Sequence, residues 1–395
     1  MHSCPSDGYA ANHYNTNLEP RDEPKPTAFF PPGYPLAIAA VWKAFGGGVT
    51  SAKLLNALLG AATIPFVFAM GRRLFGVAAG LSAAAVFALL PSGIAYVPVL
   101  LSEHLFTLLL AAALWTLACC PRRYASVAAF GAVFGLAVLT RGQGLVLLPA
   151  AALFWLQRDG WSRGVTSVGL ALLVATLLIL PWTVRNWIVM DYPIAVSSNA
   201  GMDARIGHGP AADGTFEFTS DPIDGVEMWR SSSRPDWEVR SYRVYVRRAV
   251  RYALLHPKQE IVLAKRKVEY LYRPEYQTIS PMLTMDGASP WPSPFDRMAG
   301  PVIDVTWFVV LLVGLASAVA CLRRGPEHAL LVAVFACWML FHVLSLGLPR
   351  FHLPLLPVLA VTAVGGPERL LELTRVSCAR RRQRPGPLPL PAVPS

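Results

Sequence analysis

Charged side chains are scarce in this sequence. They make up 15% of its 395 residues, whereas 54% of the residues are hydrophobic. A soluble domain usually carries about 25% charged residues, so the composition excludes an ordinary soluble enzyme. The formal net charge is +11, but the positive excess is spread over short segments between hydrophobic runs and does not follow one polar face. We therefore expect no nucleic-acid partner.

Paired cysteines are also absent. The six cysteines mostly lie within or beside hydrophobic runs, and none shows CxxC spacing; they are Cys4, Cys119, Cys120, Cys321, Cys337 and Cys378. This pattern predicts neither a zinc site nor a disulfide framework.

What the sequence does contain is a series of hydrophobic runs. A helix that spans a bilayer needs about 20 apolar residues, with a range of about 17–25. Nine segments approach that length: 51–71, 76–95, 100–120, 124–140, 143–157, 165–187, 302–322, 328–346 and 351–366. Segments 143–157 and 351–366 are short enough to be broken or partly inserted helices. The predicted fold class is an all-α polytopic membrane protein with about nine transmembrane helices.

Arginine residues orient these helices, because cytoplasmic loops collect Lys and Arg. If the nine helices alternate in direction, the arginine-rich connections all fall on one side; they are Arg72 and Arg73, Arg122 and Arg123, Arg158 and Arg163, Arg323 and Arg324, and the six arginines of the tail. We predict that this side is the cytoplasm. The turns that carry Arg141 and Arg350 then face the outside.

The expected domain organisation follows from this topology. Residues 1–50 form an outer N-terminal loop with a juxtamembrane helix, 51–188 the first six helices, 189–300 a mixed extracytoplasmic loop domain, 301–367 the last three helices, and 368–395 a basic, Pro-rich cytoplasmic tail. A polar N-terminal segment does not cross a membrane without a signal peptide or a preceding helix. We therefore expect one more apolar helix ahead of Met1.

The large outer segment has the composition of a folded surface. Residues 190–301 hold 14 acidic and 14 basic side chains together with several Tyr and Trp. Helices are expected near 236–255 and 257–272. In the second helix, Ile261, Ala264, Val268 and Leu271 form an apolar stripe that we expect to pack on the membrane domain.

Polar residues where spanning helices meet the outer surface are costly, and they are candidates for function by default. The candidates are Asp7, Glu103, His104, Arg141, Arg185, Asn186 and Arg350. Each has a structural alternative. Asp7 can be a solvated tail residue, Glu103 a charge at a helix start capped by Ser102, and the arginines side chains that reach an interface.

Several short motifs occur in a recognisable order. They are FPPGYPL at 30–36, KLLNALLG at 53–60, GRRLFG at 71–76, LLSEHLFT at 100–107, LTRGQGLVLLP at 139–149, PWTVRNW at 181–187, SSNAGMDARIGHGP at 197–210 and PRFHLPLLP at 349–357. Together they resemble the GT-C glycosyltransferases of the family-39 type, which include protein O-mannosyltransferases and aminoarabinose transferases. The resemblance covers about 30–366 and implies a GT-C-like helical bundle.

This resemblance implies an enzyme of the plasma (inner) membrane that takes a sugar from a polyprenyl-phosphate carrier at the outer face. It also implies a catalytic acid in the first outer loop, where Asp7-Gly8-Tyr9 matches the family pattern in part. Gly8 stands where the family often has a second acid, and Phe30 where it tends to have a basic residue. A divalent metal ion is left open as a cofactor.

Physical chemistry assigns roles within this resemblance. A leaving phosphate is already a stable anion, so cationic groups that hold its growing charge suffice. Arg141, Arg185 and Arg350 are predicted to bind it. An inverting displacement needs one base beside the acceptor, and Asp7 is the candidate.

Glu103 is the second candidate catalytic residue: it is expected to orient the partner of Asp7, to bind the sugar, or to help hold a metal ion with His104. The other candidates are assigned to the substrates, where Tyr9, Tyr34 and Asn186 complete the site. The acceptor, whether a protein, a lipid or a glycan, is not encoded in any motif.

Two other functions remain open from the sequence. A transporter or flippase of a lipid-linked substrate would also use outer arginines, but it should show internal repeats, and none is evident. A catalytically degenerate relative with an assembly role is compatible with the single acid at Asp7. Convergence of Asp7, Glu103, Arg141 and Arg350 around one cavity at the outer face would distinguish the enzyme.

Overall fold

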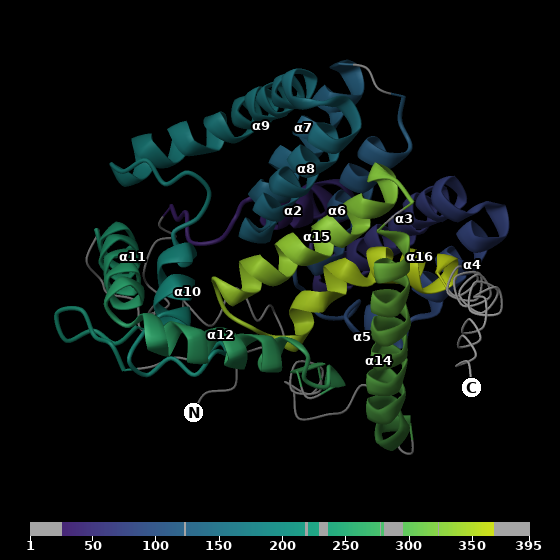
Figure 1. The fold of residues 1–395 in the computed structure, drawn as a ribbon. Coiled ribbons are helices and arrows are strands. Elements are labelled where there is room, and N and C mark those ends of the chain that lie inside the picture. Colours follow the sequence, from purple (N-terminus) through teal and green to yellow (C-terminus); the bar gives the residue numbers. More distant parts are fainter. Residues whose placement is uncertain are drawn as a thin grey trace, which may run out of the picture.

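The computed structural model describes residues 26–121, 124–217, 220–228, 236–276, 278–279, 295–322 and 324–366. Within these ranges the protein consists of helices and connecting loops, with one isolated β-bridge between Ile223 and Val226. Figure 1 shows the helices gathered into one bundle, with α10, α11 and α12 beside it. The predicted class, an all-α multi-pass membrane protein, is confirmed.

Helices occupy every hydrophobic segment. In chain order the elements before the outer segment are α2 (Gly33–Phe45), α3 (Val49–Phe75), α4 (Val77–Leu89), α5 (Pro91–Ala95), α6 (Glu103–Ala118), α7 (Tyr124–Thr140), η1 (Gly142–Val146), α8 (Leu147–Asp159) and α9 (Trp161–Met190). The elements after it are α14 (Phe295–Cys321), α15 (Pro326–Val343), η2 (Pro349–Leu355) and α16 (Leu356–Gly365). Among the described residues, four helices are long and apolar enough to cross a membrane: α3, α9, residues 298–318 of α14, and α15.

Small residues let the helices approach closely. A Cβ atom added to Gly71 of α3 would lie 2.8 Å from the Cα of Gly80 in α4. One added to Gly131 of α7 would lie 2.7 Å from the carbonyl oxygen of Ala171 in α9. Such contacts are typical of helix packing in membranes, where close backbone approach takes the place of a hydrophobic driving force. On the outside, α9 exposes Leu172, Leu173, Leu177 and Leu180, as a face toward lipid requires.

Two of the segments begin with a break. After α7 ends at Thr140, the chain forms the short 3-10 helix η1 before α8 starts, and η2 precedes α16 in the same way. Pro349 and Pro354 lie within η2, and proline interrupts the regular helical hydrogen bonds. The broken helices expected for these two segments are therefore present.

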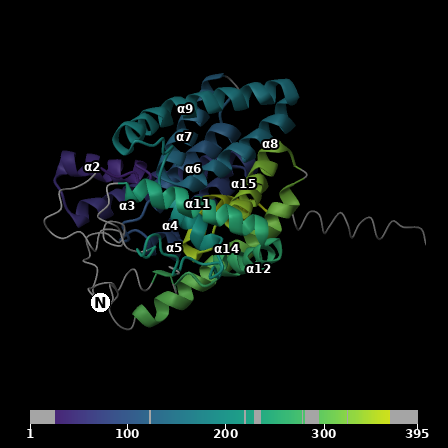
Figure 2. The same ribbon diagram turned by 90° about the vertical axis from the view of Figure 1, so that its left-hand side faces the viewer.

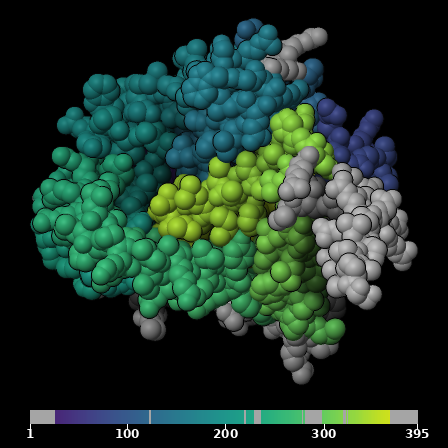
Figure 3. Space-filling model, viewed as in Figure 1, coloured from purple at the N-terminus to yellow at the C-terminus, as the bar shows by residue number. Residues whose placement is uncertain are grey.

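The described part of the outer segment is helical, with α10 (Asn199–Gly207), α11 (Trp237–Leu255) and α12 (Pro257–Leu271). The two longer helices match their predicted positions. The predicted apolar stripe of α12 is correct at Leu271, which is 2% exposed, and wrong at Ile261, which is 72% exposed. Ala264 and Val268 are half-buried, and the buried side also includes Leu263 and Lys267. In the view turned by 90°, α11 crosses the front of the molecule and α12 lies beside it (Figure 2). The space-filling view shows α12, in green, directly against the yellow-green end of α15 (Figure 3).

Candidate functional site

Glu103 forms the centre of a charged cluster. It is the first residue of α6 and its side chain is 1% exposed. One carboxylate oxygen, Oε1, lies 2.8 Å from Nη1 of Arg141 and 3.9 Å from Nε of Arg350. Arg141 comes from the break between α7 and η1, and Arg350 from η2. Three candidates that the sequence placed on the outer side of different helices therefore meet at one point.

Both arginines also contact the ring of Phe351. The guanidinium carbons lie 5.6 Å (Arg141) and 5.4 Å (Arg350) from the ring centroid, which is the range of cation–π attraction. Arg141 also donates a hydrogen bond of 3.0 Å to Oγ of Ser102. Ser102 makes no side-chain cap of α6, so the structural alternative in which Ser102 caps this helix and Glu103 is only its first charge lacks the expected capping bond.

Asp203 is a member of this cluster that was not among the predicted candidates. It lies in α10, and the charges of Arg350 and Arg141 both act on its carboxylate. Burial is the largest influence and raises the pKa of Asp203 to about 6, while the two arginines oppose the rise. Asp203 lies within the matching string 197–210, but nothing in its local sequence distinguishes it from the other acids of the outer segment.

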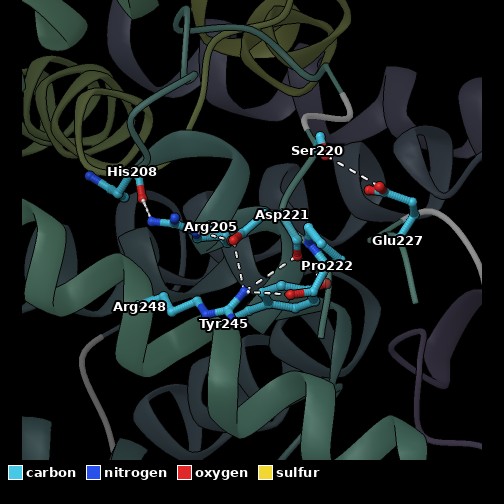
Figure 4. A network of polar contacts seen from close by, with 8 residues as sticks. All are labelled: Arg205, His208, Ser220, Asp221, Pro222, Glu227, Tyr245 and Arg248. Atoms are coloured by element: carbon cyan, nitrogen blue, oxygen red, sulfur yellow. Dashed lines mark hydrogen bonds and ion pairs between the residues drawn. The ribbon is translucent and has the colours of Figure 1, made fainter. Parts of the chain in front are cut away.

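A polar network fixes the helix that carries Asp203. Asp221 accepts a hydrogen bond from Nε of Arg205, at the end of α10, and one of 2.7 Å from Nη1 of Arg248 in α11. The hydroxyl of Tyr245 donates to the Asp221 carbonyl oxygen at 3.1 Å. Figure 4 shows Asp221 between the two arginines, with Arg205 also bonded to the His208 carbonyl oxygen. Because α10 is held on α11 in this way, Asp203 keeps a defined place beside the cluster.

Tyr34 and His104 border the cluster from two other directions. The Tyr34 hydroxyl donates to Oδ1 of Asn56 at 2.9 Å. Burial raises the pKa of Tyr34 to about 12, against the effect of this hydrogen bond, and the nearby Glu103 charge adds to the rise. Nε2 of His104 lies 3.2 Å from the Gly93 carbonyl oxygen, so this ring points away from Arg141.

His104 also lines a cavity of about 240 Å³ between α3, α4, α6 and η2. The lining is mostly apolar and includes Gly60, Ile64, Phe87, Val97, Leu353 and Leu356, with Thr63 and Thr107 as further polar groups. Since His104 and Leu353 belong to the same elements as Glu103 and Arg350, an apolar space lies beside the charged cluster.

Arg185 and Asn186 make a separate set of contacts. Arg185 donates hydrogen bonds of 3.0 Å to the Thr27 carbonyl oxygen and to Oδ1 of Asn186, and it stacks over Trp182 at 4.9 Å. Asn186 is fully buried and donates to the Ile194 carbonyl oxygen at 2.9 Å. These contacts give both residues a role in anchoring the chain at the end of α9.

Asp7 and Tyr9 lie outside the described residues, so their predicted roles remain predictions. Among the residues the structure describes, no three His, Cys, Asp or Glu side chains gather as a metal site. Glu103 contacts two arginines and Nε2 of His104 lies beside a carbonyl oxygen, and the predicted role of these two side chains as metal ligands remains a prediction.

The cluster suits the binding of an anion that arrives with an apolar tail. Two guanidinium groups can grip phosphate oxygens through paired hydrogen bonds. When no anion is bound, the carboxylates of Glu103 and Asp203 offset the positive charge of these two guanidinium groups. The apolar cavity beside them offers space for hydrocarbon.

The comparisons with known proteins agree with this chemistry. Residues 30–187 match the family model of dolichyl-phosphate-mannose-protein mannosyltransferases. The predicted family resemblance is confirmed. The matched segment covers most of the chain from α2 to α9 and includes Glu103 and Arg141. No curated protein matches the chain at a significant level.

Solved structures with similar helix arrangements include the oligosaccharyltransferase AglB from Archaeoglobus fulgidus, at 15% identity and a TM-score of 0.49 for its apo form. The match covers 94% of this chain and 47% of that one, so the chain spans less than half of that protein. A second AglB structure, with an inhibitory peptide and a dolichol-phosphate, gives a TM-score of 0.48 at 16% identity, with 91% and 44% covered. ArnT from Cupriavidus metallidurans bound to undecaprenyl phosphate gives 0.36 at 20% identity, with 92% and 72% covered.

Proposed function

We propose that this protein is an integral-membrane glycosyltransferase that uses a polyprenyl-phosphate-linked sugar as its donor. The observation that carries the proposal is the convergence of Arg141 and Arg350 on the buried Glu103 beside an apolar cavity. A phosphate attached to an isoprenoid chain has the two chemical parts that this site accommodates. The family match at residues 30–187 supports the same activity class.

The reaction is a single inverting displacement. A lone pair of the acceptor oxygen or nitrogen attacks the anomeric carbon, the bond from that carbon to the phosphate oxygen breaks, and its electrons remain on the phosphate. Arg141 and Arg350 stabilise the charge that gathers there, which is where electrostatic catalysis contributes most. The acceptor loses its proton to a base, the role that we assign to Asp7.

Glu103 holds the two arginines in place before the donor arrives. Its carboxylate is 2.8 Å from Arg141, so the guanidinium is oriented in advance and little reorganisation is needed when phosphate binds. We also assign it a contact with a sugar hydroxyl, since a carboxylate oxygen is a strong acceptor. Arg185, which is held by Asn186, supports the chain ahead of α2 at Thr27, and we assign Tyr34, near the start of α2, to the substrate site.

The proposed site faces the periplasm or the cell exterior. Arg158, in the last turn of α8, lies at the opposite end of the η1–α8 segment from Arg141, which is the distribution expected when the cluster is on the non-cytoplasmic side. The donor sugar would therefore reach the acceptor outside the cytoplasm.

Lipid analysis tests this function even while the sugar is unidentified. Cells that lack the gene should accumulate a polyprenyl-phosphate sugar, and intact-lipid mass spectrometry would identify its headgroup. The gene with Glu103→Gln or Asp7→Asn should fail to reverse the accumulation, whereas the wild-type gene should reverse it. An unchanged set of carrier-linked sugars after deletion would contradict the proposal.

A further inference from the structure

Arg350 lies on a segment that has little support of its own. The chain between α15 and α16 consists of a loop and the 3-10 helix η2, and 3-10 helices have poorer hydrogen-bond geometry than α-helices. A phosphate-binding arginine has to be held within about 0.5 Å of its working place. The support must come from other parts of the protein.

His352, two residues after Arg350, anchors this segment. Its side chain is 1% exposed, and its ring stacks on Trp307 of α14 with 3.9 Å between the centroids and 5° between the planes. Nδ1 lies 3.2 Å from Oε1 of Glu275, which is fully buried. Nε2 faces the carbonyl oxygen of Leu271 at the end of α12.

Both ring nitrogens of His352 therefore face acceptors. A neutral imidazole has only one N–H and can satisfy one of them, whereas an imidazolium donates to both. His352 and Glu275 are therefore joined by a buried hydrogen bond, which is an ion pair only when the ring is protonated. A buried polar pair of this kind seldom adds stability over well-packed apolar residues, because both groups lose their hydration. A role in fixing conformation is a better account of its presence.

Other contacts hold the same segment on α12. The buried Lys267 donates to the Val343 carbonyl oxygen at 3.3 Å. Gly347 donates its N–H to the Gly214 carbonyl oxygen at 3.0 Å, and a Cβ atom added at Gly347 would lie 2.0 Å from the carbonyl oxygen of Lys267. The outer segment thus contacts the chain on both sides of Arg350, at residues 343–347 and at His352.

We propose that Glu275 and His352 are a positioning pair, which holds η2 on the outer segment so that the guanidinium of Arg350 stays at the Glu103 cluster and binds the carrier phosphate. This inference rests on the proposed function. In addition, α12 and Glu275 control the affinity for the donor from outside the cluster, and they act only by positioning Arg350.

The first test measures binding of undecaprenyl phosphate to the purified full-length protein in detergent. Glu275→Gln should weaken binding about tenfold, because Arg350 is displaced and its charge-assisted hydrogen bond to the phosphate is lost. Arg350→Gln should weaken it by a similar factor, and the double variant should be no weaker than Arg350→Gln alone. Glu269→Gln is the matched control, since Glu269 lies on α12 with its side chain 56% exposed, and it should leave affinity unchanged. If the effects of Glu275→Gln and Arg350→Gln multiply, Glu275 does not act through Arg350 and the proposal is wrong.

The second test does not depend on any ligand. Phenylglyoxal modification followed by peptide mass spectrometry reports how accessible each arginine is. The side chains of Arg350 and Arg141 are 15% and 14% exposed, so both should react slowly in the wild type. In Glu275→Gln the rate at Arg350 should rise severalfold while that at Arg141 stays the same; equal rates at Arg350 in both proteins would overturn the positioning role. If Glu275→Gln does not fold, Glu275→Asp keeps the charge with a shorter reach and should give a smaller rise at Arg350, and no rise would again count against the pair.

The two tests separate the two proposals. If the wild type does not bind undecaprenyl phosphate but Glu275→Gln still exposes Arg350, the donor class is wrong and the positioning pair stands. If the wild type binds and Glu275→Gln changes neither affinity nor modification, the donor class stands and the positioning pair is wrong.

Discussion

Glu103 and Arg141 form an ion pair of 2.8 Å in which the carboxylate is 1% exposed and the guanidinium 14% exposed. The pair joins the start of α6 to the break that follows α7. Removing either partner leaves the other charge largely away from water, which is costly. The cluster is therefore sensitive to single substitutions, and this sensitivity can be measured.

Glu103→Gln should impair both folding and transfer. The substitution keeps the shape of the side chain but leaves Arg141 and Arg350 without their shared counter-charge, at an expected cost of about 3 kcal/mol in unfolding free energy. We expect sugar transfer to fall by about a hundredfold or more. Thermal unfolding in detergent and lipid analysis of complemented cells measure the two effects. Full transfer by the variant would contradict the role of Glu103.

Asp203→Asn should remove a pH dependence of stability. The pKa of Asp203 is raised to about 6 in the folded protein, so folding takes up a proton at pH values between its ordinary pKa and 6. The contribution of Asp203 to stability therefore falls as the pH rises from that ordinary pKa to about 6, and it stays low above that. Melting temperatures of the wild type and the variant at pH 5, 6 and 7.5 should differ most at pH 7.5, in favour of the variant. If the melting temperatures of the two proteins change with pH in parallel, Asp203 has an ordinary pKa.

Gly131→Ala should separate α7 from α9. The added methyl group would lie 2.7 Å from a backbone oxygen of Ala171, which cannot move aside as a flexible side chain does. We expect a loss of about 1–3 kcal/mol in stability. Gly169→Ala in α9 is the control, because nothing lies within 4 Å of the added atom, and it should be neutral or stabilising by up to about 1 kcal/mol. Thermal unfolding of both variants gives the comparison.

Cysteine labelling tests which side of the membrane the cluster faces. Ala211→Cys, beyond α10, should react with a membrane-impermeant maleimide on intact cells, because both the outer segment and Arg350 are predicted to lie outside. Arg163→Cys, near the start of α9, should react only after the membrane is opened. Both positions are exposed, and subtraction of the wild-type signal accounts for the native cysteines. Labelling in the opposite order would place the cluster in the cytoplasm.

The helices were largely predictable from local sequence. The run at 165–187 lies within α9, and the prolines at 349 and 354 coincide with the break at η2. A hydropathy profile averages over many residues, so it locates a helix correctly even when its predicted ends are wrong by a few residues. The face of α12 was predicted only in part, because its buried side includes Lys267 beside Leu271, and a search for apolar stripes rejects a lysine.

The cluster was predictable only in part. Glu103, Arg141 and Arg350 stood out because charged residues are rare at the ends of apolar helices. The same signal selected Arg185, whose contacts belong to Thr27 and Asn186. Asp203 and Glu275 lie among many charged residues of the outer segment, where composition carries no information about which side chains turn inward. Only the tertiary arrangement of α10 and of the chain that follows α12 identifies them.

The last helix that the structure describes has a consequence for assembly. Residues 356–362 of α16 are all buried within the protein, and its ten residues are too short to cross a bilayer alone. Its packing surface is complete only when α4 and α14, which contact it, have come together. We therefore expect α16 to pack into the bundle after the helices that surround it. Arg350, which precedes α16 in the chain, would then join the cluster at the end of assembly.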